Sequence, residues 1–125
     1  MALAAKAIFK PFQEDRETFQ EYFKNSLTSN LRIVDEVAKY LVRHKGKQLR
    51  PMLVIVSART IAEPTKASYL AAVVVELLHT ATLVHDDVIE DSDLRRGLET
   101  LNTVWGENSS VLMGDFIFAR ALNTL

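Results

Sequence analysis

The feature that most constrains the fold is a long apolar stretch, KASYLAAVVVELLHTATLVHDD, at residues 66–87. At roughly 1.5 Å per residue it predicts a helix of about three dozen ångströms, the central element of the chain. Residues 67–84 approach the length of a membrane span, but Glu76 and His79 lie within them and would be costly in hydrocarbon. We therefore expect a buried core helix, in which these two side chains are either satisfied polar groups or the lining of a cleft.

The rest of the chain shows helical periodicity and almost no strand pattern. Apolar residues recur at spacings of three, four and seven within 11–27, and a second apolar stripe covers 31–42. Pro51 suits the first turn of a helix, Gly46 suits the C-terminal cap of the preceding one, and 109–125 keeps an apolar pattern to its last residue. Residues 1–12 are too short for a signal or a span, so we expect a leading helix or arm. The sequence predicts an all-α fold and one domain over residues 1–125.

Composition excludes several classes of function. With 15 basic and 16 acidic residues the net charge is −1, so no global field favours nucleic acid or an anionic membrane. The chain has no cysteine, which limits metal chemistry to oxygen ligands or histidine and suits a reducing compartment. We expect a cytoplasmic location.

Carboxylates crowd the end of the long helix, in the stretch HDDVIEDSD at 85–93. If the helix continues, Asp86 and Glu90 are four residues apart and share one face. Asp87 and Asp91 are also four apart and share the neighbouring face. Each such pair of like charges costs about 0.2–0.5 kcal/mol on an exposed helix, so a cation is expected nearby. The competing interpretation is a solvated acidic helix end.

Basic residues near this cluster indicate which cation and ligand would fit. Arg95 and Arg96 follow within ten residues of Asp86, and Lys47 and Arg50 open another helical segment. Magnesium takes one or two protein carboxylates and completes its shell with water and phosphate, and arginine matches phosphate geometry. Carboxylates, basic groups and an apolar wall together suggest magnesium-bridged phosphate that carries an apolar tail.

Two other metal sites fail on spacing. A calcium loop that starts at Asp86 would have apolar Val88 as a ligand and Asp91 where glycine is required. The zinc motif H-E-x-x-H is absent, and His79 and His85 are six apart, which places them on different faces of a helix.

Four motifs in one order resemble those of the trans-isoprenyl diphosphate synthases, or polyprenyl synthetases. They are GKQLRP at 46–51, ELLHTATLVHDD at 76–87, DDVIEDSDLRRG at 86–97 and VLMGDFIFARA at 111–121. The resemblance covers nearly the whole chain beyond residue 40 and implies an isoprenoid-synthase-type helical bundle. The family's second aspartate-rich motif is absent, so we expect only the N-terminal helices of that bundle and the N-terminal part of a single synthase domain.

The resemblance also implies an activity, namely magnesium-dependent condensation of isopentenyl diphosphate with an allylic diphosphate to make a medium- or long-chain all-trans polyprenyl diphosphate. In that family pattern the chemistry falls to Asp86, Asp87 and Arg95, and Mg²⁺ to Asp86, Asp87, Glu90 and Asp91. Glu90 stands where the family usually has aspartate. Isopentenyl diphosphate is assigned to Lys47, Arg50, His79 and Arg96, and the allylic diphosphate to Arg95. Ala81 and Thr82 are small residues at the positions that control chain length.

Two alternatives stay open from the sequence. One is a catalytically silent helical fragment or subunit that acts by association, because half of the expected metal site is missing. The other is a terpene cyclase, against which the acceptor residues argue. We expect this chain alone to be inactive, to form homo-oligomers because apolar helix faces are uncovered, and to approach membranes only through a lipid product.

Overall fold

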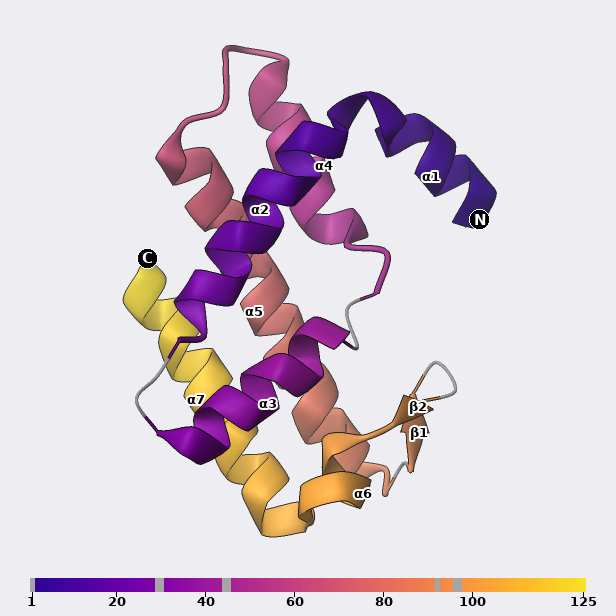
Figure 1. Ribbon diagram of the computed structural model, residues 1–125, viewed down its shortest axis with the longest axis vertical. Helices are drawn as coiled ribbons and strands as arrows, with labels where there is room; N and C mark the ends of the chain where they lie inside the picture. Colours follow the sequence, from indigo (N-terminus) through magenta and orange to yellow (C-terminus); the bar gives the residue numbers. More distant parts are fainter. Residues whose placement is uncertain (1, 29–30, 44–45, 92, 96–97) are drawn as a thin grey trace.

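The computed structural model describes residues 2–28, 31–43, 46–91, 93–95 and 98–125. Helices dominate these residues, which confirms the all-α prediction (Figure 1). A short antiparallel hairpin, in which Arg95 pairs with Leu98, was not expected from the sequence. The elements in chain order are α1 (Ala2–Phe9), a 3-10 turn (Lys10–Phe12), α2 (Gln13–Ser26), α3 (Arg32–Arg43), α4 (Leu49–Arg59), α5 (Lys66–Ile89), β1 (Leu94–Arg95), β2 (Leu98–Glu99), α6 (Leu101–Trp105) and α7 (Glu107–Thr124).

Helix α5 is the centre of the bundle, as the long apolar stretch predicts. α4 and α7 pack along it, and α2 and α3 cross it on one side (Figure 1). Its buried positions Val73, Leu77, Ala81 and Val84 recur every three or four residues and so form one stripe. By length and composition α5 could cross a membrane, and it is the one such helix among the described residues. Its packed stripe is that of a core helix.

A buried carboxylate joins α2, α4 and α5. Asp15 is 3% exposed, accepts a hydrogen bond from Arg59 Nη2 at 2.7 Å and another from the hydroxyl of Tyr69 at 2.8 Å. The hydrogen bond from Arg59 lowers the pKa of Asp15 despite its burial, and burial raises the pKa of Tyr69. A buried charge persists only when it is paired in this way, so the three residues fix how the helices meet.

Tyr40 ties α3 to the hairpin and to α6. Its hydroxyl donates to the backbone carbonyl of Glu99, and its ring meets that of Trp105 edge-on at 5.3 Å between centroids. Burial, reinforced by the negative charges of Asp87 and Glu99, raises the pKa of Tyr40 to about 12. The amphipathic helix α3 is thereby held over α5 near the acidic end.

The loop before α4 differs from the prediction. The sequence predicts Gly46 as the cap of the preceding helix, yet among the described residues Gly106 is the only glycine with a positive φ. Gln48 takes the left-handed conformation instead, with φ 57° and ψ 38°, immediately before Leu49 opens α4. Pro51 lies in the first turn of α4, as predicted.

Candidate functional site

The turn before α4 and the middle of α5 together form a cleft of about 360 Å³. The residues that line it are Gly46, Lys47, Gln48, Leu49, Arg50, Glu76 and His79. The structure thus brings three predicted substrate-binding residues to one place, although 29 residues of sequence separate Arg50 from His79. The two cationic side chains outnumber the single carboxylate of Glu76, so the cleft has a net positive charge that suits an anion.

Arg50 and His79 contact each other directly. Nη1 of Arg50 lies 3.2 Å from Nε2 of His79. A guanidinium can only donate, so Nε2 of His79 is the acceptor and the imidazole is neutral in this arrangement. His79 therefore acts here as a neutral hydrogen-bonding group, whereas Arg50 and Lys47 supply the charge.

His79 and Asp86 share one face of α5. They are seven residues apart, which is almost two full turns and about 10 Å along the axis. Thr82 lies between them on the same face and is exposed, and its hydroxyl donates to the backbone carbonyl of His79 at 2.7 Å. One side of α5 therefore runs from the cationic cleft, past a small residue, to the acidic end.

The acidic end is less regular than a continuing helix would make it. α5 ends at Ile89, and the N–H of Glu90 still bonds to the carbonyl of Asp86 at 2.8 Å. Asp91 turns into the left-handed region with φ 51°, so the predicted stacking of Asp91 on Asp87 is wrong. Ending the helix there separates two like charges that would repel on adjacent turns.

The four predicted metal ligands have unequal surroundings. Asp86, Glu90 and Asp91 are exposed, whereas Asp87 is only 6% exposed and lies on the packed side of α5. In the part of the chain that the structure describes, no three Asp, Glu or His side chains converge closely enough to hold a metal ion. Magnesium needs one or two protein carboxylates when phosphate completes its shell, so Asp86 and Glu90 are chemically suitable for it.

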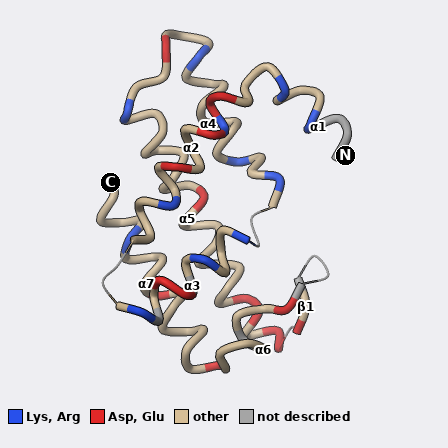
Figure 2. Tube along the Cα trace, viewed as in Figure 1, with Lys and Arg blue, Asp and Glu red and all other residues tan. Residues whose placement is uncertain are grey.

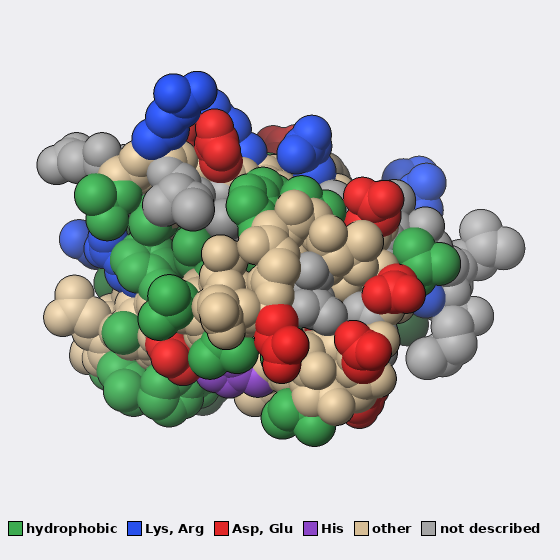
Figure 3. Space-filling model, turned by 90° about the horizontal axis from the view of Figure 1, so that it is seen from below, with side chains coloured by type: hydrophobic (Ala, Val, Ile, Leu, Met, Phe, Trp, Pro, Cys, Tyr) green, Lys and Arg blue, Asp and Glu red, His purple; other side chains and the backbone are tan. Residues whose placement is uncertain are grey.

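Electrostatics at this helix end favour a bound cation. The last turn of α5 contains no basic residue, and its carboxylates add to the negative end of the helix dipole. Figure 2 shows several acidic residues at the lower end of the molecule, besides others along its length, and Figure 3 shows carboxylates beside an apolar area on the face seen from below. The excess negative charge makes this end of α5 suitable for a cation.

The remaining predicted residues are only partly placed. The backbone of Arg95 belongs to β1, but the structure does not describe its side chain. Arg96 lies outside the described residues. Ala81 is 2% exposed and packs in the core, whereas Thr82 faces outward. The roles of these four residues stay predictions.

His85, beside the acidic end, contacts α7 in a way that the sequence did not predict. Nε2 of His85 lies 3.2 Å from the carbonyl oxygen of Val111 and 3.3 Å from Oδ1 of Asp115. The imidazole sits directly against Gly114 of α7, where a Cβ would overlap the ring. The pair GD within VLMGDFIFARA was the available signal, because a glycine inside a helix suggests a close approach.

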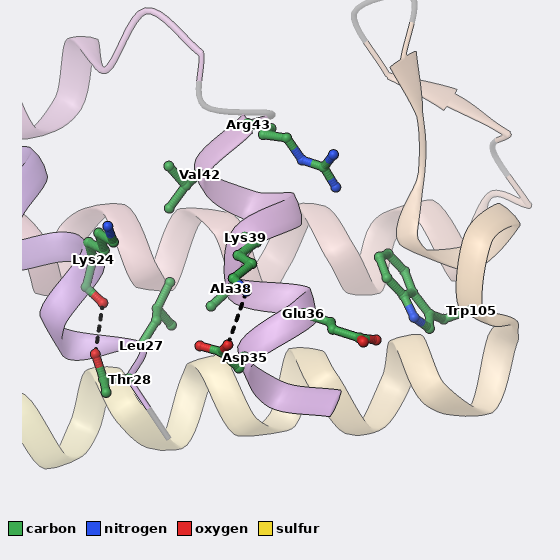
Figure 4. A pocket seen from close by; sticks show the side chains of 10 residues that line it. All are labelled: Lys24, Leu27, Thr28, Asp35, Glu36, Ala38, Lys39, Val42, Arg43 and Trp105. Carbon is green, nitrogen blue, oxygen red and sulfur yellow. Dashed lines mark hydrogen bonds and ion pairs between the residues drawn. The ribbon is translucent and has the colours of Figure 1, made fainter. Parts of the chain in front are cut away.

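A larger hollow of about 570 Å³ lies elsewhere, among α2, α3 and α6 (Figure 4). Leu27, Ala38, Val42 and Trp105 form its apolar lining, and charged side chains such as Arg43 stand at its rim. It contains none of the predicted site residues. The cleft at His79 is the smaller of the two but has the chemistry of an anion site.

Comparison with known proteins identifies the family. The model of the polyprenyl synthetase family matches residues 31–125, and the chain belongs to this family. The all-trans-nonaprenyl-diphosphate synthase (geranyl-diphosphate specific) of Rhodobacter capsulatus is 38% identical over 119 residues, which cover 94% of this chain and 37% of that protein. The octaprenyl diphosphate synthase of Escherichia coli (strain K12) is 40% identical over 99 residues, which cover 79% of this chain and 31% of that one.

A solved structure shows the same arrangement of helices. The polyprenyl synthase of Caulobacter crescentus CB15, complexed with calcium and isoprenyl diphosphate, matches with a TM-score of 0.88 and 34% identity. The match covers 96% of this chain and 37% of that one. The chain therefore has the fold of an isoprenoid synthase, and it spans about a third of the length of the relatives it matches.

Proposed function

We propose that this chain forms the diphosphate-binding wall of a polyprenyl diphosphate synthase. The proposed reaction is condensation of isopentenyl diphosphate with an allylic diphosphate to a medium- or long-chain all-trans polyprenyl diphosphate. The observation that carries it is the shared face of α5, on which His79 in the cationic cleft and Asp86 at the acidic end lie about 10 Å apart. Two separate places for a diphosphate on one wall, one cationic and the other dependent on a bound cation, suit two diphosphate substrates, whereas a cyclase would need only one.

Each residue has a distinct part in this proposal. Lys47 and Arg50 hold the diphosphate of isopentenyl diphosphate by charge. Once the anion draws Arg50 away, neutral His79 takes the tautomer with its proton on Nε2 and donates a hydrogen bond to the anion. Half-buried Leu83, which lies between the two ends on the same side of α5, would contribute apolar surface that excludes water, which would otherwise quench an allylic cation. The alkene then attacks the allylic carbon, and a proton leaves the adduct. The diphosphate released from the allylic substrate can accept this proton, so no protein base is required.

Magnesium is the cofactor we propose for the acidic end. Asp86 and Glu90 would hold it on the exposed side of α5, with Asp87 and Asp91 beside them. When bound it would neutralise charge that develops on the departing allylic diphosphate. The calcium and isoprenyl diphosphate named with the Caulobacter enzyme support a divalent cation together with this class of ligand.

Association and location are further parts of the proposal. α7 leaves an outward stripe of exposed apolar residues, and stripes of this kind favour association. We propose a homo-oligomeric, cytoplasmic enzyme that meets membranes through its lipid product and does not bind nucleic acid. The exposed members of the stripe are Val111, Leu112, Phe118, Leu122 and Leu125.

The test compares the 125-residue chain with an extended enzyme, in which residues 1–125 are joined to the C-terminal part of the Escherichia coli octaprenyl diphosphate synthase. Both are incubated with magnesium, radiolabelled isopentenyl diphosphate and an allylic primer. The proposal is supported if the extended enzyme makes elongated product and the 125-residue chain makes none. Absence of product from the extended enzyme, when the intact Escherichia coli enzyme is active in the same assay, would favour the silent-subunit alternative.

A further inference from the structure

The turn that presents Lys47 and Arg50 is built on an unusual residue. Gln48 has φ 57° and ψ 38°, a left-handed backbone conformation that residues other than glycine, asparagine and aspartate rarely adopt. Its carbonyl nevertheless accepts the hydrogen bond from the N–H of Met52 at 3.2 Å, so the strained residue also opens α4. A conformation of this kind persists only when the surroundings hold it in place.

The surroundings that hold Gln48 come from a distant helix. Nε2 of Gln20, on α2, donates to Oε1 of Gln48 at 2.9 Å across 28 residues of sequence. The Gln48 residue is 5% exposed, whereas its neighbours Lys47 and Arg50 are exposed. The chain therefore turns one side chain inward to meet α2 and leaves the two cationic side chains on either side of it to face the cleft.

We propose that the hydrogen bond between Gln20 and Gln48 is a latch that positions the cationic turn for isopentenyl diphosphate. The two glutamines are positioning residues that act through Lys47 and Arg50. Gln48 also lines the cleft, whereas Gln20 does not, so Gln20 reports on the latch alone. With Gln48 fixed in the left-handed region, Arg50 reaches Nε2 of His79 from the opposite wall. Without the latch, the turn samples other backbone conformations and the two cations no longer point at one anion. This inference rests on the proposed function for the identity of the anion, but not for the mechanics of the turn.

Two variants remove the latch in different ways. Gln20→Met keeps the length of the side chain and deletes its donor. Gln48→Gly deletes the acceptor while tolerating a positive φ, so it separates the hydrogen bond from backbone strain. Gln13→Met is the matched control, because Gln13 is an exposed residue at the start of the same helix. Circular dichroism confirms that each variant folds.

The first measurement needs no catalysis and uses the 125-residue chain. Lys47 is an exposed trypsin site in the turn, and we expect its cleavage rate to rise with the population of the open form of the turn. Loss of one hydrogen bond should accelerate this cleavage by about 2- to 10-fold in either latch variant and not in Gln13→Met. The double variant should be no faster than either single one, because both remove the same interaction.

The second measurement uses the extended enzyme. Each latch variant should raise the KM for isopentenyl diphosphate by about 2- to 10-fold, with kcat and the KM for the allylic substrate unchanged. Equal effects on both substrates, or a loss of kcat alone, would overturn the latch as a device for the acceptor site. If the parent extended enzyme makes no product, the proposed function fails by itself, and the tryptic rates decide the latch: acceleration supports it and unchanged rates refute it.

Discussion

The imidazole of His85 lies against Gly114, so α5 and α7 approach each other where the acidic cluster begins. A Cβ on Gly114 would occupy the space of the ring atoms Cδ2 and Nε2. The same ring makes polar contacts with Val111 and Asp115 of α7. His85 directly precedes Asp86, so this contact between the two helices lies beside the first carboxylate of the cluster.

This contact predicts that Gly114→Ala destabilises the parent chain but stabilises a chain that carries His85→Ala. In the parent chain the added methyl group should lower the free energy of unfolding by about 1–2 kcal/mol, because the imidazole must leave its place. In a His85→Ala background the clash is gone, and alanine should stabilise the helix by about 0.5–1 kcal/mol relative to glycine. Urea denaturation of the four variants checks this. Destabilisation of equal size in both backgrounds would show that the ring is not what Gly114 accommodates.

The buried carboxylate of Asp15 predicts a dependence of stability on pH. Because Arg59 lowers the pKa of Asp15 in the folded state, the ionised form contributes stability above the unfolded pKa of about 3.9. That contribution is lost as the pH falls through the lower, folded value. Asp15→Asn should cost about 1–3 kcal/mol at pH 7, and the difference from the parent should shrink as the pH falls below about 4.

Urea denaturation at several pH values measures this difference. Glu63→Gln is the control, because Glu63 is exposed but also pairs with Arg59, at 3.2 Å. It should change stability little at any pH, since exposed ion pairs contribute little. A constant gap between Asp15→Asn and the parent from pH 7 to pH 3 would contradict the role given to the ionised carboxylate.

The unequal burial of neighbouring carboxylates predicts different consequences for Asp86 and Asp87. Asp86→Asn should abolish magnesium-dependent binding of an allylic diphosphate to the extended enzyme and leave stability nearly unchanged, because Asp86 is exposed. Asp87→Asn should weaken the same binding and also lower stability, because Asp87 is buried. Calorimetry with and without magnesium, paired with thermal unfolding, separates the two effects. Unchanged binding by Asp86→Asn would remove it from the proposed metal site.

Arg50→Ala distinguishes the two proposed anion sites. Loss of a charged hydrogen bond should raise the KM for isopentenyl diphosphate by about 10- to 100-fold in the extended enzyme, with a much smaller effect on the allylic substrate. Arg32→Ala is the control, since the side chain of Arg32 is 94% exposed on α3, pairs with Glu36 and does not line the cleft. Steady-state kinetics with each substrate varied in turn gives both constants. Equal rises for both substrates would reassign Arg50.

The helices could be predicted because their signal is local. The periodicity of apolar residues located α2, α3, α5 and α7, and the sequence motifs grouped Lys47, Arg50 and His79 as one substrate-binding set. The left-handed Gln48 could not be found in this way, because glycine is the residue that usually marks such a conformation and Gly46 lies two positions away. It depends on Gln20, and a hydrogen bond across 28 residues leaves no periodic trace.

The acidic end shows the same limit. An unbroken helix would pair Asp87 with Asp91, but α5 ends at Ile89 with no glycine or proline to announce it. The residue that turns the chain is Asp91 itself, one of the few residue types that tolerate a positive φ. Likewise, the contact of His85 with Gly114 depends on how two helices pack. Sequence patterns indicated the residue types of the site, whereas their division into exposed and buried carboxylates required the fold.

Chain length provides the last prediction, because Ala81 and Thr82 face different surroundings on α5. Thr82 is exposed between His79 and Asp86, where a tail anchored at the acidic end would pass, and Ala81 is packed in the core. With small residues at both positions we expect the extended enzyme to make a product longer than a geranylgeranyl chain. Thr82→Phe should shorten it by filling the path, at little cost in stability. Ala81→Phe should also shorten it, but overpacking should cost about 1–3 kcal/mol.

The control for both substitutions is Ala71→Phe, which adds the same bulk at an exposed position of α5 several turns away. It should leave product length and magnesium binding unchanged. Chromatography of the radiolabelled products gives the lengths, and thermal unfolding gives the stabilities. Shortening by Ala81→Phe alone would place the growing tail on the packed side of α5. No shortening by either variant, with normal activity, would show that the tail leaves the acidic end along another wall.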